Sequence, residues 1–377
     1  MSHDLIVFGE DYGRHPSSTQ HIVRRLAQGR KVVWVNSLGL RRPRLALRDL
    51  SRLANKAARL VSRPPAPDVD GQAWTHPFAA LVEPRAIPWP GSRLAAGINR
   101  ALVGRQVAAA MHRCGIDRPV LWTSLPTALP LIGAFGERAV IYYAGDDFAA
   151  LHGVDHAPVL DMELRLAEKA DLILAASAEI GARFDPAKTV HLPHGVDYDL
   201  FSTPAAPAPQ LPQGKVAGFY GSLNGWIDVE AIARAAKRLP DWTFLLIGRV
   251  ETDLAALAGL SNVRLHPAVP HAALPAFSQN WTVSLLPFRQ TRQIEASNPL
   301  KLREYLAAGR PVATTHLFPA VVDTGAPVAA PGPDEGLADA ILAAQARETQ
   351  FRAFARRLQS ESWEQRASVV ASLIDMF

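Results

Sequence analysis

The chain has 377 residues, of which 48% are hydrophobic and 20% charged, so it can form a packed core, and its length favours two domains. Its single cysteine, Cys114, excludes an intramolecular disulfide and fits a reducing compartment. The short apolar run at residues 5–8 follows an acidic start and does not form a secretory signal. Because the longest uncharged stretch is interrupted by prolines, we expect no transmembrane segment and a cytoplasmic protein.

The formal net charge is +5, and the positive charge is unevenly distributed. Residues 41–63 hold many arginines and one lysine but only one acid, Asp49, with leucines recurring at roughly helical spacing. An amphipathic basic helix of this kind suits an anionic membrane surface or a pyrophosphate-linked acceptor. The alternative is a solvated helix that caps a domain. No aromatic residues are interleaved with these bases, so we expect no nucleic acid partner.

Short apolar runs alternate with helical patterns along most of the chain, which predicts the α/β class with parallel sheets covered by helices. In the first half, the predicted strands are residues 5–8, 31–36, 120–123, 139–143, 171–175 and 189–192. In the second half they are residues 216–220, 243–247, 263–266, 282–286 and 312–315.

A proline-rich stretch separates these two series and predicts the domain boundary. We expect a first domain over residues 1–202, a linker over 203–213 and a second domain over 214–360. Ligands of open α/β sheets bind beyond the carboxyl ends of the strands, so the loops at those ends are the candidate sites.

One predicted helix in the second half has the features of an anion site. Asn298 is a suitable N-cap, Pro299 suits the first helical position, and Gly309 ends the helix. The helix dipole and Lys301 favour a diphosphate, and Glu304 can accept hydrogen bonds from the two hydroxyls of a ribose. The alternative is an exposed Lys/Glu pair that stabilises the helix slightly.

Residues 301–312 contain the run K-x-x-E-Y-L-A-x-G-x-P-V, which resembles the nucleotide-binding helix of GT-B glycosyltransferases. The resemblance is to family 4 and related bacterial polysaccharide-assembling enzymes. It implies that Lys301 contacts the donor phosphates and that Glu304 contacts the ribose. Many family 4 members carry a second glutamate upstream, where this chain has Ala296, with Glu295 one position away.

Other segments extend the resemblance to nearly the whole chain. Gly221 and Ser222 lie in a loop similar to the G-x-L loop that opens the second domain. Gly248 and Arg249 resemble the I-G-x step of these enzymes, and Arg249 could supply a second phosphate charge. Gln20 and His21 lie where similar enzymes meet donor or acceptor phosphates. Residues 362–366 look like the terminal helix of these enzymes, so we expect residues 361–377 to cross back onto the first domain. The implied fold is two Rossmann-like domains facing a cleft.

Asp146 and Asp147 follow a predicted strand of the first domain and are the candidate catalytic residues. Glycosyl transfer needs a base near the acceptor hydroxyl, and an aspartate at a sheet edge can supply it. The alternative for either aspartate is helix capping. Metal sites of the D-x-D type belong to a different transferase fold, and Lys301 with the helix dipole can stabilise a leaving diphosphate. We therefore expect no metal and no cofactor.

The resulting hypothesis is a metal-independent glycosyltransferase, of hexosyl or glucuronosyl type, that uses a UDP- or GDP-linked sugar. The acceptor would be a glycan or a lipid-linked molecule in bacterial cell-surface polysaccharide assembly. Residues 41–63 would hold the protein on the inner face of the plasma membrane. The alternatives are a sugar-nucleotide epimerase of the same fold and a noncatalytic scaffold that binds a partner or lipid.

Overall fold

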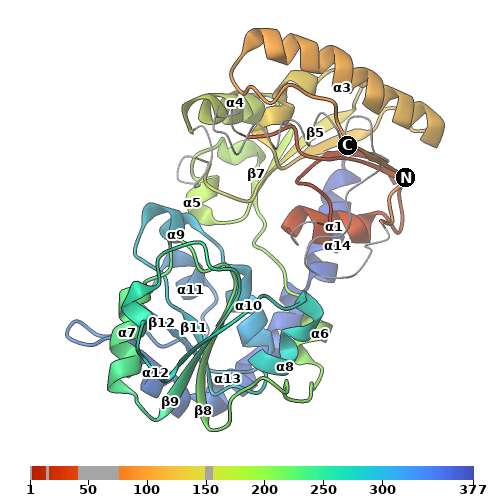
Figure 1. Cartoon of the computed structure of the whole chain (residues 1–377). Coiled ribbons are helices and arrows are strands. Elements are labelled where there is room, and N and C mark those ends of the chain that lie inside the picture. The colour runs from red at the N-terminus through yellow and green to blue at the C-terminus, as the bar shows by residue number, and fades with distance from the viewer. Residues whose placement is uncertain (1, 14–16, 41–75, 149–155) are drawn as a thin grey trace. The chain divides into compact units, whose positions relative to one another are not determined.

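A computed structural model describes residues 2–13, 17–40, 76–148 and 156–377 of the chain (Figure 1). The basic segment at residues 41–63 lies outside the described residues. The chain divides into two compact units, residues 1–192 with 367–377, and residues 193–366. Each unit is built on its own parallel sheet.

The first unit contains a sheet of seven strands in the order β3-β2-β1-β4-β5-β6-β7, with every neighbouring pair parallel. Its strands are β1 (Leu5–Phe8), β2 (Val32–Val35), β3 (Ala80–Val82), β4 (Val120–Thr123), β5 (Ala139–Ala144), β6 (Leu172–Ala175) and β7 (Thr189–His191). Strands β1, β2, β4, β5 and β6 are buried along their whole length, as expected for a parallel sheet covered on both faces. Six of the seven strands were predicted, and only the three-residue β3 was missed.

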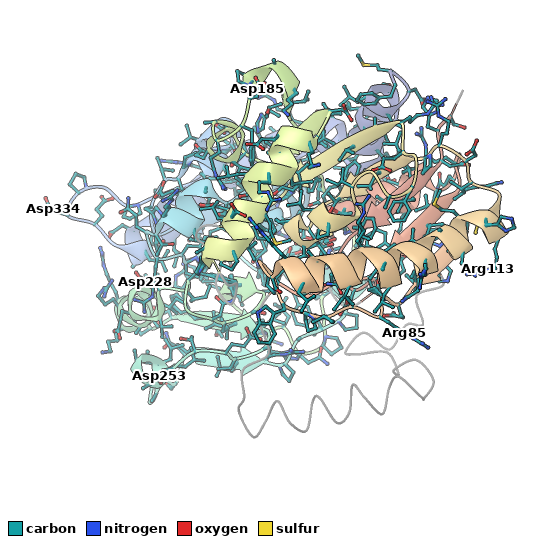
Figure 2. The ribbon with its side chains drawn as sticks, turned by 90° about the horizontal axis from the view of Figure 1, so that it is seen from above. Arg85, Arg113, Asp185, Asp228, Asp253 and Asp334 are labelled. Atoms are coloured by element: carbon teal, nitrogen blue, oxygen red, sulfur yellow. The ribbon has the colours of Figure 1, made fainter. Side chains whose placement is uncertain are left out.

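Helical segments connect these strands and cover the sheet. They are α1 (Ser18–Leu26), α3 (Arg93–Cys114), η1 (Pro126–Leu131), α4 (His156–Lys169), α5 (Ala178–Gly181) and η2 (Pro186–Lys188). The long α3 begins at the Ser92 cap and ends at Gly115, which has a left-handed backbone, and Arg113 lies near that end (Figure 2).

The second unit contains five parallel strands in the order β10-β9-β8-β11-β12. They are β8 (Lys215–Tyr220), β9 (Trp242–Ile247), β10 (Val263–His266), β11 (Val283–Leu286) and β12 (Val312–Thr314), and all five were predicted. The helical segments are α6 (Tyr198–Ser202), α7 (Val229–Arg238), η3 (Ala255–Leu257), η4 (His271–Ala273), α8 (Pro275–Ser278), α9 (Arg292–Ala296), α10 (Leu300–Ala307), α11 (Pro319–Asp323), α12 (Leu337–Ala346), α13 (Glu348–Ala355) and η5 (Arg356–Glu361).

The boundary between the units differs from the predicted one, because it falls between Leu192 and Pro193 rather than in residues 203–213. The proline-rich stretch belongs to the second unit and is tied to the end of α8. The side chain of Gln279 donates to the carbonyl of Thr203 and accepts from the amide of Ala205, and the amide of Ala208 donates to Ala276. The structure assigns no helix or strand to residues 203–213, and the proline content could not show that this segment packs against a helix.

The last helix, α14 (Trp363–Ile374), begins in the second unit, and residues 367–377 belong to the first. Within the first unit, Asp375 forms an ion pair with Arg30 at 3.4 Å, and the carbonyl of Phe377 accepts a hydrogen bond from Arg138. The sequence analysis expected residues 361–377 in the first domain, whereas residues 361–366 belong to the second unit. Across the described residues, we find no helix that combines the length and apolarity needed to cross a membrane.

Candidate donor site and acidic site

Two glycines bring the ends of neighbouring strands β8 and β9 into contact. Gly221 follows β8 with φ +132°, and Gly248 follows β9 with φ +153°. A side chain on Gly248 would overlap the carbonyl oxygen of Gly221, so the two backbones meet without room for a methyl group. The amide of Gly221 donates to Ile247 at 2.8 Å and holds this arrangement. Both positions therefore favour glycine, and Gly248 has no room for a side chain.

Lys301, in the first turn of α10, packs directly on this backbone. A Cβ atom on Gly221 would overlap Cε of Lys301 and lie 2.8 Å from its Nζ. The Nζ atom also lies 5.7 Å from the ring centre of Phe219, a cation–π distance. Burial lowers the pKa of Lys301, and the charge of Glu304 partly opposes that shift. The sequence placed Gly221 and Lys301 in one site, and the structure brings them into contact.

The start of α10 differs from the prediction by one residue. The helix begins at Leu300, with Pro299 in the N-cap position. Asn298 is buried, and its Oδ1 accepts a hydrogen bond from the guanidinium of Arg303, whose Nε donates to Glu361 at 2.8 Å. The hydrogen bond from Arg303 to Asn298 thus helps to anchor the start of α10.

Glu304 lies one turn further along α10, and each of its carboxylate oxygens has a partner within the protein. The hydroxyl of Tyr220 donates to Oε2 at 2.8 Å, and Nε2 of His271 lies 2.8 Å from Oε1. Burial and the nearby charge of Glu304 raise the pKa of Tyr220 well above its usual value, so its hydroxyl stays protonated and donates. The hydroxyl of Tyr305 accepts from the amide of Tyr220 and fixes the end of β8.

Ser222 and Arg249 lie at the same edge of the sheet, with exposed side chains. Their loops are joined because the amide of Leu223 donates to the carbonyl of Arg249 at 2.8 Å. The predicted donor site comprises six residues, and all of them lie at or beside the carboxyl ends of β8 and β9 and the start of α10: Gly221, Ser222, Arg249, Asn298, Lys301 and Glu304. This is the sheet edge at which open α/β folds bind ligands.

Asp146 lies just beyond β5 at the carboxyl edge of the first sheet. Asp146 is an exposed residue. Partial desolvation at this edge, followed by the negative charges of Glu10 and Asp147, raises the pKa of Asp146 to about 6. Glu10 follows β1 and accepts hydrogen bonds from Ser17 at 3.0 Å and Ser124 at 3.4 Å. Burial raises the pKa of Glu10 as well.

Asp147 has a different environment from its neighbour. It is buried, and its Oδ1 forms an ion pair with Nη1 of Arg183 at 2.8 Å. The other guanidinium nitrogen of Arg183 pairs with the buried Glu163, which accepts from the hydroxyl of Tyr142 at 2.7 Å. The two adjacent aspartates thus divide into a buried ion-paired residue and an accessible one with a raised pKa.

Gln20 and His21 lie in the first turns of α1, and both are buried. The Oε1 of Gln20 accepts from the amide of Gly13 at 3.2 Å and so orders the loop after β1. This hydrogen bond accounts for one role of Gln20 within the protein.

Sequence reasoning missed Glu10, His271 and Arg183. Glu10 could have been found from its position two residues after a predicted strand. His271 and Arg183 carry no such signal, because their partners lie 33 and 36 residues away in the sequence.

Residues 214–346 match the family Glycosyl transferases group 1. The chain is 31% identical, over 223 residues, to the putative teichuronic acid biosynthesis glycosyltransferase TuaH of Bacillus subtilis (strain 168). That match covers 53% of this chain and 56% of the relative, so the chain spans about half the length of the relative it matches.

Two solved structures have similar folds. Anabaena Alr3699/HepE in complex with UDP and glucose has a TM-score of 0.68 at 14% identity, with 100% of both chains covered. WaaG, a glycosyltransferase involved in lipopolysaccharide biosynthesis, has a TM-score of 0.61 at 15% identity and covers 98% of this chain and 99% of its own. The chain has the GT-B fold. The family match falls on the unit that carries Gly221, Lys301 and Glu304.

Proposed function

We propose that the protein is a glycosyltransferase that moves a sugar from a nucleoside diphosphate, preferably UDP, to a glycan or lipid-linked acceptor. The observation that carries this proposal is the contact between Lys301 and the backbone of Gly221, one turn from the carboxylate of Glu304. The group 1 family match and the polysaccharide-assembling relative support the reaction class. The neighbour with bound UDP and glucose supports the choice of donor.

The reaction follows from the charges of these groups. The acceptor oxygen forms a bond to the anomeric carbon, and the bond from that carbon to the diphosphate breaks, leaving both electrons on the diphosphate. Lys301 and the amides of Gly221 and Ser222 would stabilise the negative charge on the departing group without requiring a metal ion. Arg249, with its exposed side chain, can add a second charge.

Asp146 is the proposed base that takes the proton of the acceptor hydroxyl. Its raised pKa supports this role, because a base works best when its pKa lies close to the working pH. Asp147 is assigned a structural role instead, since its carboxylate is buried against Arg183. The expected membrane contact of residues 41–63, at the inner face of the plasma membrane, remains part of the proposal.

A thermal-shift panel of UDP, GDP and their sugar conjugates tests the donor site, since a ligand that binds only the folded protein raises its melting temperature. We expect a shift with UDP that Lys301→Ala abolishes. Lys237→Ala is the matched control, because Lys237 is an exposed lysine on α7 of the same unit. The absence of a shift with every nucleotide, or an equal shift in both variants, would contradict the proposal.

A further inference from the structure

His271 is the side chain that contacts Glu304 from the loop after β10. It begins the short η4 segment, and its ring lies 5.4 Å from that of the fully buried Phe201. On the other side, its Nε2 lies 2.8 Å from Oε1 of Glu304. Since an ionised carboxylate only accepts hydrogen bonds, Nε2 carries the hydrogen of this contact.

The carboxylate of Glu304 is therefore held from two sides, by Tyr220 on Oε2 and by His271 on Oε1. A free glutamate side chain samples several rotamers, and two donors from different segments restrict it to one. Each carboxylate oxygen can accept about two hydrogen bonds, so each keeps capacity for one more partner. The side chain of Glu304 is 12% exposed and that of His271 is 24% exposed, so ligands can reach the pair.

We infer that His271 is a positioning residue that orients Glu304 toward the two adjacent hydroxyls of a ribose, and so sets the preference for ribonucleotides. This inference rests on the proposed donor site. Two neighbouring hydroxyls match two neighbouring carboxylate oxygens only when the carboxylate has one fixed orientation. Without His271, Glu304 keeps its contact with Tyr220 but can rotate away from one hydroxyl.

The test measures binding of UDP and of 2′,3′-dideoxyuridine diphosphate by calorimetry. We expect wild-type protein to bind UDP at least about tenfold more tightly than the dideoxy analogue, because the analogue cannot donate to Glu304. His271→Ala should weaken UDP binding by about tenfold and leave the affinity for the analogue unchanged within about twofold. His271→Gln, which keeps an N–H donor, should restore part of the preference.

His266→Ala is the matched control. This histidine ends β10, and its ring packs against Phe277. It should keep the wild-type preference. Circular dichroism melting of each variant checks that it is folded.

The outcomes separate the two proposals. If wild-type protein prefers UDP and His271→Ala keeps the full preference, the role of His271 is refuted while the donor site stands. Equal weakening of both ligands by His271→Ala also refutes it, since a general structural defect does not depend on hydroxyls. If wild-type protein binds neither ligand, or binds both equally, the assignment of Glu304 to the ribose fails, and the role of His271 fails with it.

Discussion

Alanine substitution of three glycines tests the geometry of the proposed donor site. Gly225 lies in the same loop as Gly221, with no atom near the position of an added Cβ, so Gly225→Ala should change the free energy of unfolding by less than about 0.5 kcal/mol. Gly221→Ala adds a methyl group against the flexible end of Lys301 at a φ of +132°. The backbone strain alone predicts a loss of about 2 kcal/mol. Gly248→Ala meets a backbone oxygen that cannot move aside, and should lose more than about 3 kcal/mol.

The same variants separate stability from binding. Gly221→Ala must displace the ammonium group of Lys301, so UDP affinity should fall by about tenfold or more beyond any effect of unfolding. Urea denaturation measures the stability of each variant, and calorimetry at a temperature where each is folded measures affinity. The reasoning is refuted if Gly221→Ala binds UDP as tightly as wild-type protein, or if Gly225→Ala weakens binding to the same extent.

Four further predictions follow from the charged groups. Lys301→Met removes a cation that is costly to bury, so the melting temperature of the unliganded protein should stay equal or rise. The shift in melting temperature that UDP induces should disappear. A lower melting temperature of the unliganded variant would contradict this prediction. With Asp146 as the base, kcat/KM should fall about tenfold per pH unit below about pH 6. Glu10→Gln removes a charge that raises the pKa of Asp146, so it should move this fall in kcat/KM to lower pH. An unchanged pH profile in Glu10→Gln would argue against the coupling of Glu10 to Asp146. Folding raises the pKa of Asp146 from 3.8 to about 6, so the folded protein favours the protonated carboxyl. The stability that this protonation contributes is present below about pH 3.8 and is lost as the pH rises to about 6. Asp146→Asn should therefore melt no lower than wild-type protein at pH 7. Arg183→Met leaves two buried carboxylates without their cation and should reduce the free energy of unfolding by about 3 kcal/mol in urea titrations, whereas a change below about 1 kcal/mol would show that the ion pairs contribute little.

The strands of both sheets were predictable because each is a short apolar run between polar loops. Eleven of the twelve strands were predicted in this way, and the three-residue β3 (Ala80–Val82) was missed. The start of α10 was predicted within one residue from Asn298 and Pro299. The boundary between the units was not predicted, because the longer proline-rich stretch at residues 203–213 was chosen over Pro193, at which the second unit begins.

Local sequence determined that Gly221 and Asp146 follow strands and that Lys301 and Glu304 lie in the first turns of a helix, which made these four residues candidates. Only the tertiary structure decided their ion pairs, hydrogen bonds and exposure. It paired Asp147 with Arg183 and left Asp146 accessible, and it placed His271 against Glu304. The physical reason is that periodicity and capping act over a few neighbouring residues. Ion pairing and desolvation depend instead on segments that are distant in the sequence and that meet only when the sheet is assembled.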